Sequence, residues 1–244
     1  MPDERVQKIL ARAGFGSRRS CESLIEQGQV TINETIAHLG SKADPLKDTI
    51  AVGGVAIRHE EPLIYIALNK PKGVLSDEDL KDTRTTVMDL VPVSERLFSV
   101  GRLDFDSEGL ILLTNDGELA NRLTHPRYQH EKEYRVLVDR RIDEQQLAIW
   151  RRGVVLKDGH RTAPAKVEVD STVGKGTWLR VTLREGRKRQ IREVGSQIGL
   201  PVSRIIRVRI SSLALGNLKT GEWRYLTRGE IATLKRQSEN TNQS

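Results

Sequence analysis

The chain has 244 residues, of which 37% are hydrophobic and 4% aromatic, and its formal net charge at neutral pH is +7. This composition allows one large or two smaller domains with a buried core. It contains no apolar run long enough to cross a membrane, and we expect no signal peptide at its polar start. A single cysteine, Cys21, excludes an internal disulfide and a cysteine-based zinc site, which favours a cytosolic protein.

The positive charge is concentrated in two segments. Residues 184–209 hold eight arginines or lysines against two glutamates, and residues 1–20 hold five against two acidic residues. A near-neutral body with two basic segments is typical of a protein that binds a polyanion, although charge runs are often simply solvated surfaces. Because aromatic residues are scarce, we do not expect a binding surface of stacked aromatic side chains.

Residues 1–58 predict two short helices followed by a small sheet. Apolar residues at helical spacing from Val6 to Ala13 define the first helix, and Ser17 is a suitable N-cap for a second helix that ends near Gly28. Alternating residues then predict short strands over 29–33, 35–39 and 48–52. Arg18 and Arg19 would stand in the first turn of the second helix, where they oppose the helix dipole unless an anion such as an RNA phosphate binds there.

This N-terminal region resembles the S-four-like RNA-binding domain. The resemblance is carried by RVQKIL (5–10), GFGSRR (14–19) and LIEQGQVTIN (24–33), with Glu34 where glycine is usual. It implies an α/β RNA-binding module over 1–58. It also implies that Arg18, Arg19 and Lys8 contact RNA.

Beyond a polar linker at 55–63, strands and helices alternate. Period-two and buried apolar patterns predict strands at 63–70, 109–115, 133–139, 165–170, 177–183 and 205–210. Helical patterns fall at 86–91, 117–124, 143–152 and 188–198. This order indicates an α+β domain over 63–234 with a mainly antiparallel or mixed sheet. Residues 235–244 lack apolar side chains and are expected to be disordered.

The most unusual segment is GRLDFDSEGLILLTNDG (101–117), in which Asp104, Asp106 and Glu108 alternate between two apolar strands. It partly copies a calcium-binding loop, but Asn115 stands where a bidentate glutamate is needed and the flanks are not helical. The carboxylates could instead solvate a turn, or Asp104 could be a catalytic carboxylate that acts without metal. Spacing alone leaves these last two interpretations open.

Four motifs together resemble RNA pseudouridine synthases. They are the GRLD segment at 101–104 followed by Ser107 and Gly109, the NKPKG segment at 69–73, EKEYR at 131–135 and EGRKRQIR at 185–192. They occur in the family's order, after the S-four-like domain. The resemblance covers residues 4–230 and is strongest to the bacterial branch that modifies single uridines in ribosomal RNA, especially its large-subunit members.

The resemblance implies the isomerisation of uridine to pseudouridine, without cofactor or metal, in a monomer that binds no membrane. Asp104 would act on the ribose, either by attack at C1′ or by removal of a sugar proton. Arg192 would pair with Asp104, and Tyr134 would stack near the flipped base. Arg102 would fill the space that the flipped uridine leaves in the RNA. The remaining expected RNA contacts are Lys70, Lys72, Arg187, Lys188 and Arg189.

Two other functions are compatible with parts of this pattern. A non-catalytic RNA-binding factor in ribosome assembly could share the fold, but such a protein has no use for an aspartate that faces a phosphate polymer. A metal-dependent RNA hydrolase would require acidic metal ligands and would lose activity in EDTA.

Overall fold

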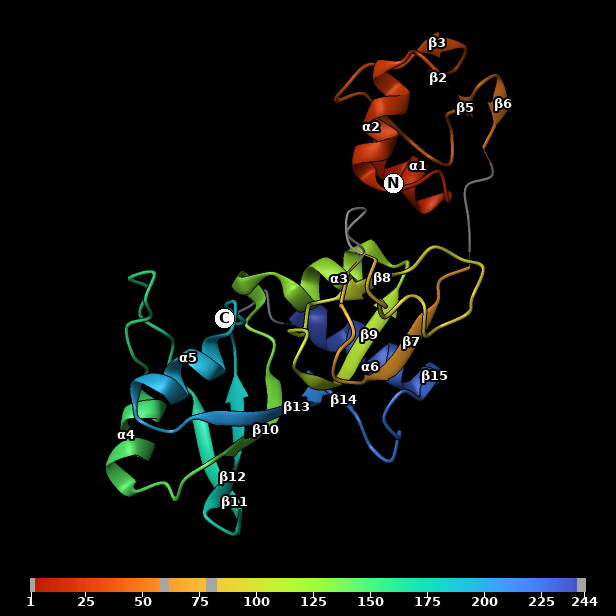
Figure 1. Cartoon of the computed structure of the whole chain (residues 1–244). Coiled ribbons are helices and arrows are strands. Elements are labelled where there is room, and N and C mark those ends of the chain that lie inside the picture. Colours follow the sequence, from red (N-terminus) through yellow and green to blue (C-terminus); the bar gives the residue numbers. More distant parts are fainter. Residues whose placement is uncertain (1–2, 58–61, 78–82, 241–244) are drawn as a thin grey trace. The chain divides into compact units, whose positions relative to one another are not determined.

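A computed structural model describes residues 3–57, 62–77 and 83–240. It divides into two compact units (Figure 1). The first comprises Met1–Leu63 with the short segments Val93–Arg96 and Asn115–Gly117, and the second comprises the rest of the chain. No helix in the described ranges is long and apolar enough to span a lipid bilayer.

The first unit packs two helices, α1 (Val6–Arg12) and α2 (Arg18–Glu26), with short strands. The strands are β1 (Glu4–Arg5), β2 (Val30–Ile32), β3 (Thr35–Ile36), β4 (Lys42–Ala43), β5 (Ile50–Val52) and β6 (Val55–Ala56). They form a four-stranded sheet of order β3-β2-β5-β6 and the separate pair β1-β4. Apolar residues from both helices and from the sheet, including Ile9, Ile25 and Ile50, build one core.

The start of α2 has the predicted cap. The hydroxyl of Ser17 accepts a hydrogen bond from the backbone N–H of Ser20, at 3.0 Å. This bond satisfies one of the donors that a helix leaves free at its N-terminus. Arg18 and Arg19 follow directly and are exposed, so both side chains are open to solvent at the helix start.

The second unit is built on a nine-stranded sheet, counted over the described residues. The order along its main path is β11-β12-β10-β13-β9-β7-β15, while β14 pairs with β13 and β8 pairs with β9. Neighbouring strands are antiparallel except β9 and β13, which run parallel. The α+β class with a mixed sheet is therefore confirmed. The strands are β7 (Tyr65–Lys70), β8 (Phe98–Val100), β9 (Glu108–Thr114), β10 (Lys132–Val138), β11 (Lys166–Val173), β12 (Gly176–Leu183), β13 (Val202–Ile210), β14 (Leu213–Ala214) and β15 (Trp223–Tyr225).

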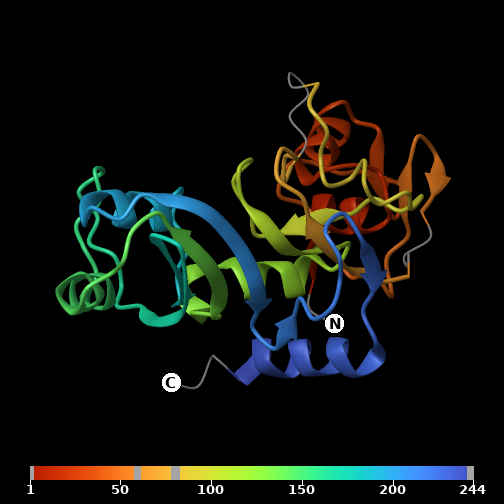
Figure 2. The same cartoon turned by 60° about the horizontal axis from the view of Figure 1, so that its bottom comes forward.

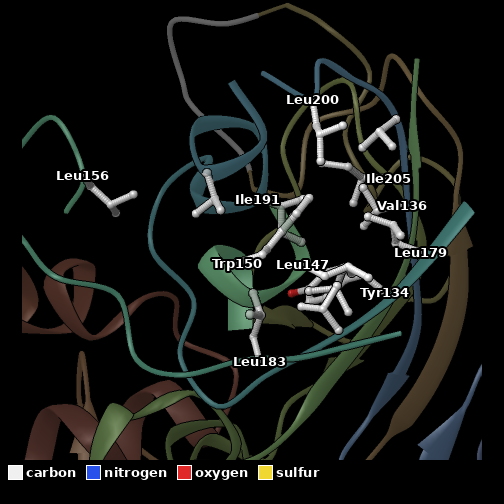
Figure 3. Packing of buried hydrophobic residues seen from close by; sticks show 14 of the residues in the cluster. Tyr134, Val136, Leu147, Trp150, Leu156, Leu179, Leu183, Ile191, Leu200 and Ile205 are labelled. Atoms are coloured by element: carbon white, nitrogen blue, oxygen red, sulfur yellow. The ribbon is translucent and has the colours of Figure 1, made fainter. Parts of the chain in front are cut away.

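Two apolar cores lie on this sheet. In the first, helices α4 (Glu144–Arg152) and α5 (Gln190–Gln197) pack against β10, β12 and β13, and Figure 3 shows Trp150 and Ile191 from these helices close to Tyr134 and Val136 of β10. In the second, α3 (Gly117–Thr124) and α6 (Arg228–Asn240) pack against β7 and β9. Tyr134 belongs to the first core, so its ring is held by packing on several sides.

Two expectations about secondary structure are wrong. Residues 86–91 form a turn and not a helix, because the Asp89 carboxylate accepts hydrogen bonds from the backbone N–H and the hydroxyl of Thr86. Residues 235–240 of the expected disordered tail are helical, because α6 continues to Asn240. This helix is the long blue one near the C-terminus in Figure 2. Within it Leu234 and Ser238, one helical turn apart, are both buried. Residues 241–244, and residues 58–61 of the expected linker, lie outside the described ranges.

Candidate active site

The second unit contains a cavity of about 600 Å³. Its walls come from the turn after β8, the strand β10 and the loop that leads into α5. Six of the predicted site residues line it, namely Arg102, Asp104, Tyr134, Arg187, Lys188 and Arg189. A cavity of this size is in the range that accommodates a nucleotide-sized ligand.

Asp104 lies in the turn between β8 and β9 and is half-buried. Its carbonyl oxygen accepts a hydrogen bond from the backbone N–H of Ser107, at 3.0 Å, which closes the turn. Leu103 before it is buried in the first core. Apolar and acidic residues alternate here for a structural reason: Leu103 anchors the turn in the core, and Asp104 faces the cavity.

Tyr134 is opposed by a residue that the sequence analysis did not single out. Arg207 of β13 is its direct partner across the β10–β13 pairing, and both are buried. The Arg207 guanidinium donates from Nε to the carbonyl of Leu110, at 2.7 Å, and from Nη1 to that of Arg102, at 3.3 Å. Burial lowers the pKa of Arg207, and the nearby Tyr134 opposes this effect. The sequence did contain a signal for the burial of Arg207, because this basic residue occupies an inward position in the alternating pattern of its strand.

Gly109, which follows the GRLD segment, allows the strands β9 and β13 to approach each other closely. Gly109 of β9 is paired with Arg207 where the two strands run parallel. Its φ is +105°, and a Cβ atom at this position would overlap the backbone of Arg207. Glycine is therefore required for the close approach of β13 to the turn that carries Asp104.

Lys70 is placed differently from expectation. Its side chain is fully buried, and Nζ donates to the carbonyl of Pro71 at 2.9 Å, so it cannot contact RNA. Burial lowers the pKa of Lys70 to about 8, against the opposing influence of the carboxylates of Glu108, Asp104 and Asp106. Lys132 is similar: burial and the charge of Arg207 lower its pKa to about 8. The sheet therefore holds basic side chains that are turned into the domain and away from solvent.

Arg192 also differs from expectation, because its donors are used by main-chain carbonyls. Nη1 donates to Val202 at 2.9 Å and Nη2 donates to Asp106 at 3.2 Å. Among the described residues, no ion pair joins Arg192 to Asp104. The side chain links the start of α5 to the carboxylate turn two residues beyond Asp104, and it is not one of the described residues that line the cavity.

The three alternating carboxylates do not converge. Glu108 forms a two-pronged ion pair with Arg204 of β13, at 2.6 and 3.1 Å, whereas Asp104 faces the cavity. In the described part of the chain, no group of three or more His, Cys, Asp or Glu residues is arranged to hold a metal ion. The arrangement therefore does not correspond to a calcium loop.

The basic loop before α5 forms one rim of the cavity. Arg187, Lys188 and Arg189 are exposed, and Arg187 pairs with Asp158 at 3.0 Å. Arg189 adopts a left-handed conformation with φ of 55° immediately before the helix. These side chains stand at the N-terminal end of α5, where the helix dipole and the charges of Lys188 and Arg189 combine to attract an anion, while Asp158 partly neutralises Arg187.

The other expected RNA contacts are not among the described residues that line the cavity. Lys72 is exposed. In the first unit, Arg18 and Arg19 are exposed, whereas the ammonium group of Lys8 pairs with the Glu4 carboxylate at 2.8 Å. Lys8 is therefore partly neutralised within the protein and is a poorer candidate for a phosphate contact than the two arginines.

One cavity beside the mixed sheet thus combines a carboxylate, a tyrosine and a basic loop, a combination that suits an enzyme with an anionic substrate. Comparison with known proteins identifies the class. Residues 64–197 match the RNA pseudouridylate synthase family, and residues 4–45 match the S4 domain. The chain belongs to the RNA pseudouridylate synthase family, whose members are isomerases.

Individual relatives extend this match over nearly the whole chain. The ribosomal large subunit pseudouridine synthase B of Bacillus subtilis is 39% identical over 95% of this chain and 96% of its own length. An RNA pseudouridine synthase of Aquifex aeolicus is 40% identical over 96% of this chain and 94% of its own length. A crystal structure of a pseudouridylate synthase superposes with a TM-score of 0.67 and 31% identity, covering 94% of this chain and 99% of that one.

Proposed function

We propose that this protein converts a specific uridine of large-subunit ribosomal RNA to pseudouridine, with Asp104 as the catalytic carboxylate. The observation that carries the proposal is the shared cavity of Asp104 and Tyr134, bordered by the basic loop of Arg187, Lys188 and Arg189. The ribosomal substrate is supported by the names of relatives in Bacillus subtilis and Yersinia pestis, the latter 40% identical over 90% of this chain and 71% of its own length.

The reaction breaks the bond between N1 of uracil and C1′ of ribose. The base turns, C5 bonds to C1′, the proton of C5 leaves, and N1 gains a proton. The product is an isomer of the substrate, so the reaction needs no oxidant or reductant. A carboxylate at Asp104 can assist by attack at C1′ or by removal of a sugar proton, and both steps require it to be ionised and well oriented.

The surrounding residues divide the remaining tasks. A uridine stacked in RNA is out of reach, so the nucleotide has to be flipped into the cavity at a cost of a few kcal/mol. Tyr134 offers a ring on which the base can stack. Arg102, which lines the cavity and is exposed, can fill the vacated space, and the basic loop can hold the phosphates of the RNA backbone.

The RNA is held by two separate parts of the protein. Exposed Arg18 and Arg19 at the start of α2 suit a second RNA contact in the first unit. The cavity lies within one unit of a single chain, which supports a monomeric enzyme. A ribosomal RNA substrate in bacteria would place the protein in the cytosol.

The decisive experiment compares Asp104→Asn with Asp106→Asn. Release of the C5 proton from tritiated RNA measures turnover, and filter binding measures affinity. We expect Asp104→Asn to abolish turnover and to leave affinity within a few fold, because binding relies on cations. Asp106, whose side chain does not line the cavity, is the matched control and should stay active. Normal turnover by Asp104→Asn would contradict the assignment, and RNA binding without turnover by the unaltered protein would indicate an assembly factor.

A further inference from the structure

The backbone around Asp104 is held by a neighbouring segment, Gly73–Asp77, which we call the strap. Ser76 of the strap is 4% exposed, and its hydroxyl donates to the carbonyl of Leu103 at 2.7 Å and accepts from the N–H of the same residue at 2.9 Å. The N–H of Gly73 donates to the carbonyl of Phe105 at 2.9 Å. The strap therefore binds the residue before Asp104 and the residue after it.

These contacts restrict the two peptide groups that flank Asp104. The peptide group before it contains the Leu103 carbonyl, which Ser76 holds. The peptide group after it contains the Asp104 carbonyl, which accepts from the N–H of Ser107 at 3.0 Å. Because both planes are fixed, the direction of the Cα–Cβ bond of Asp104 is fixed as well, and the carboxylate retains only its two side-chain torsions.

The strap is itself anchored and does not depend on Asp104. Backbone hydrogen bonds of 2.9 Å join the N–H of Leu75 to the carbonyl of Thr85 and the N–H of Val87 to the carbonyl of Leu75. The Asp77 carboxylate accepts from the hydroxyl of Ser99 at 2.7 Å and pairs with Arg102 at 3.2 Å. The strap thus contacts the chain on both sides of the catalytic turn.

We propose that Ser76 is a positioning residue for the isomerisation, in which its hydroxyl orients Asp104 toward the ribose through both polar atoms of the Leu103 backbone. The proposal rests on the proposed catalytic role of Asp104. Ser76 lines the same cavity, but its hydroxyl is engaged by the backbone of Leu103 as both donor and acceptor, so we expect its effect to be on orientation and not on RNA affinity. A misplacement of about 1 Å at a reacting group lowers a rate by on the order of 10²-fold.

The test uses the full-length protein and three substitutions at one position. Ser76→Ala removes the hydroxyl, Ser76→Cys keeps the shape with a poor hydrogen-bond donor, and Ser76→Thr keeps the hydroxyl. We expect single-turnover rates to fall about 10- to 100-fold for Ala and Cys, and to stay within a few fold for Thr. Dissociation constants for the RNA should stay within about twofold in all three. If Ser76→Ala does not fold, Ser76→Cys carries the same expectation.

A matched control separates positioning from loss of stability. Thr177 is 1% exposed, and its hydroxyl donates to the carbonyl of Arg140 at 3.0 Å, at the opposite end of β12 from the cavity. Thr177→Val should lower Tm without changing the single-turnover rate. The proposal is overturned if Ser76→Ala or Ser76→Cys keeps the wild-type rate, or if Ser76→Thr is as slow as these two. Turnover by Asp104→Asn in the same assay would instead overturn the proposed function.

Discussion

Tyr134 and Arg207 face each other across the pairing of β10 and β13, and the Arg207 side chain is buried almost completely. A fully buried guanidinium is costly unless it is hydrogen-bonded, and here Nε donates to the carbonyl of Leu110 and Nη1 to that of Arg102, whereas Nη2 is buried without a hydrogen-bond partner among the described residues. Leu110 lies in β9, and Arg102 lies in the turn that carries Asp104. Arg207 therefore connects the strand that carries Tyr134 with the turn that carries Asp104, and both of these residues line the cavity.

Replacement of Arg207 by lysine should lower both stability and turnover. A lysine keeps the charge but cannot reach both carbonyls, and a lost hydrogen bond at a buried charged group costs about 1–3 kcal/mol. Urea denaturation and single-turnover kinetics measure the two effects. Arg209→Lys is the control, because Arg209 lies in the same strand but pairs with Glu131 and Glu133 in a partly exposed network. Equal behaviour of the two variants would contradict the role of Arg207.

Replacement of Arg192 by lysine should reduce turnover by tens of fold while RNA affinity changes little. The planar guanidinium spans the carbonyls of Val202 and Asp106, and a lysine can bond to one of them at a time. The carboxylate turn would then lose its link to α5. Single-turnover rates and binding constants should be measured on the same preparation. A variant with the wild-type rate and weakened binding would show that Arg192 contacts phosphate instead.

The salt dependence of RNA binding should report on the first unit. Each phosphate contact contributes about 0.7–0.9 to the slope of log affinity against log salt. The double variant Arg18→Gln, Arg19→Gln should bind RNA more weakly. Its slope of log affinity against log salt should be shallower by the amount that corresponds to one or two phosphate contacts. Lys8→Gln should have a smaller effect, because Lys8 is already paired with Glu4. An unchanged slope in the double variant would show that the start of α2 does not contact RNA.

The pH dependence of stability should reveal the buried charge of Lys70. Burial lowers its pKa from 10.5 to about 8. Below pH 8 the amine is protonated in both the folded and the unfolded state, so it adds no pH dependence. Between pH 8 and about 10.5 the unfolded chain binds more protons than the folded one, so the free energy of unfolding rises with pH through this group.

Lys70→Met removes that contribution. The free energy of unfolding of the wild type, minus that of Lys70→Met, should therefore increase between pH 8 and pH 10. Chemical denaturation at several pH values measures the difference, and Lys72→Met at an exposed position is the control. Curves that run parallel for wild type and Lys70→Met would show that Lys70 is not held at a lowered pKa.

The sequence by itself determined the helices whose spacing and capping signals lie within a few residues of one another. The helix α3 (Gly117–Thr124) begins and ends where its apolar spacing predicts, and α2 has the predicted Ser17 cap. A helix begins and ends through contacts between residues three or four apart, so its pattern is legible in the chain. The family motifs likewise placed Asp104 and Tyr134, and both line one cavity.

Tertiary structure decided which charges are exposed and which are internal. The sequence analysis did not separate Lys70 and Arg207 from the exposed basic residues, yet both are buried in the paired strands of the sheet. The last part of α6, where Ser238 is buried and the Ser211 hydroxyl donates to the side chain of Gln237, also depends on the fold, as do the Asp89 contacts that replace a predicted helix by a turn. Whether a charged side chain meets water or a carbonyl oxygen depends on segments about a hundred residues away, as for Arg207 and Leu110. The alternation of a strand can show that a side chain points inward, but it does not show which group that side chain meets, because the partner lies on another strand.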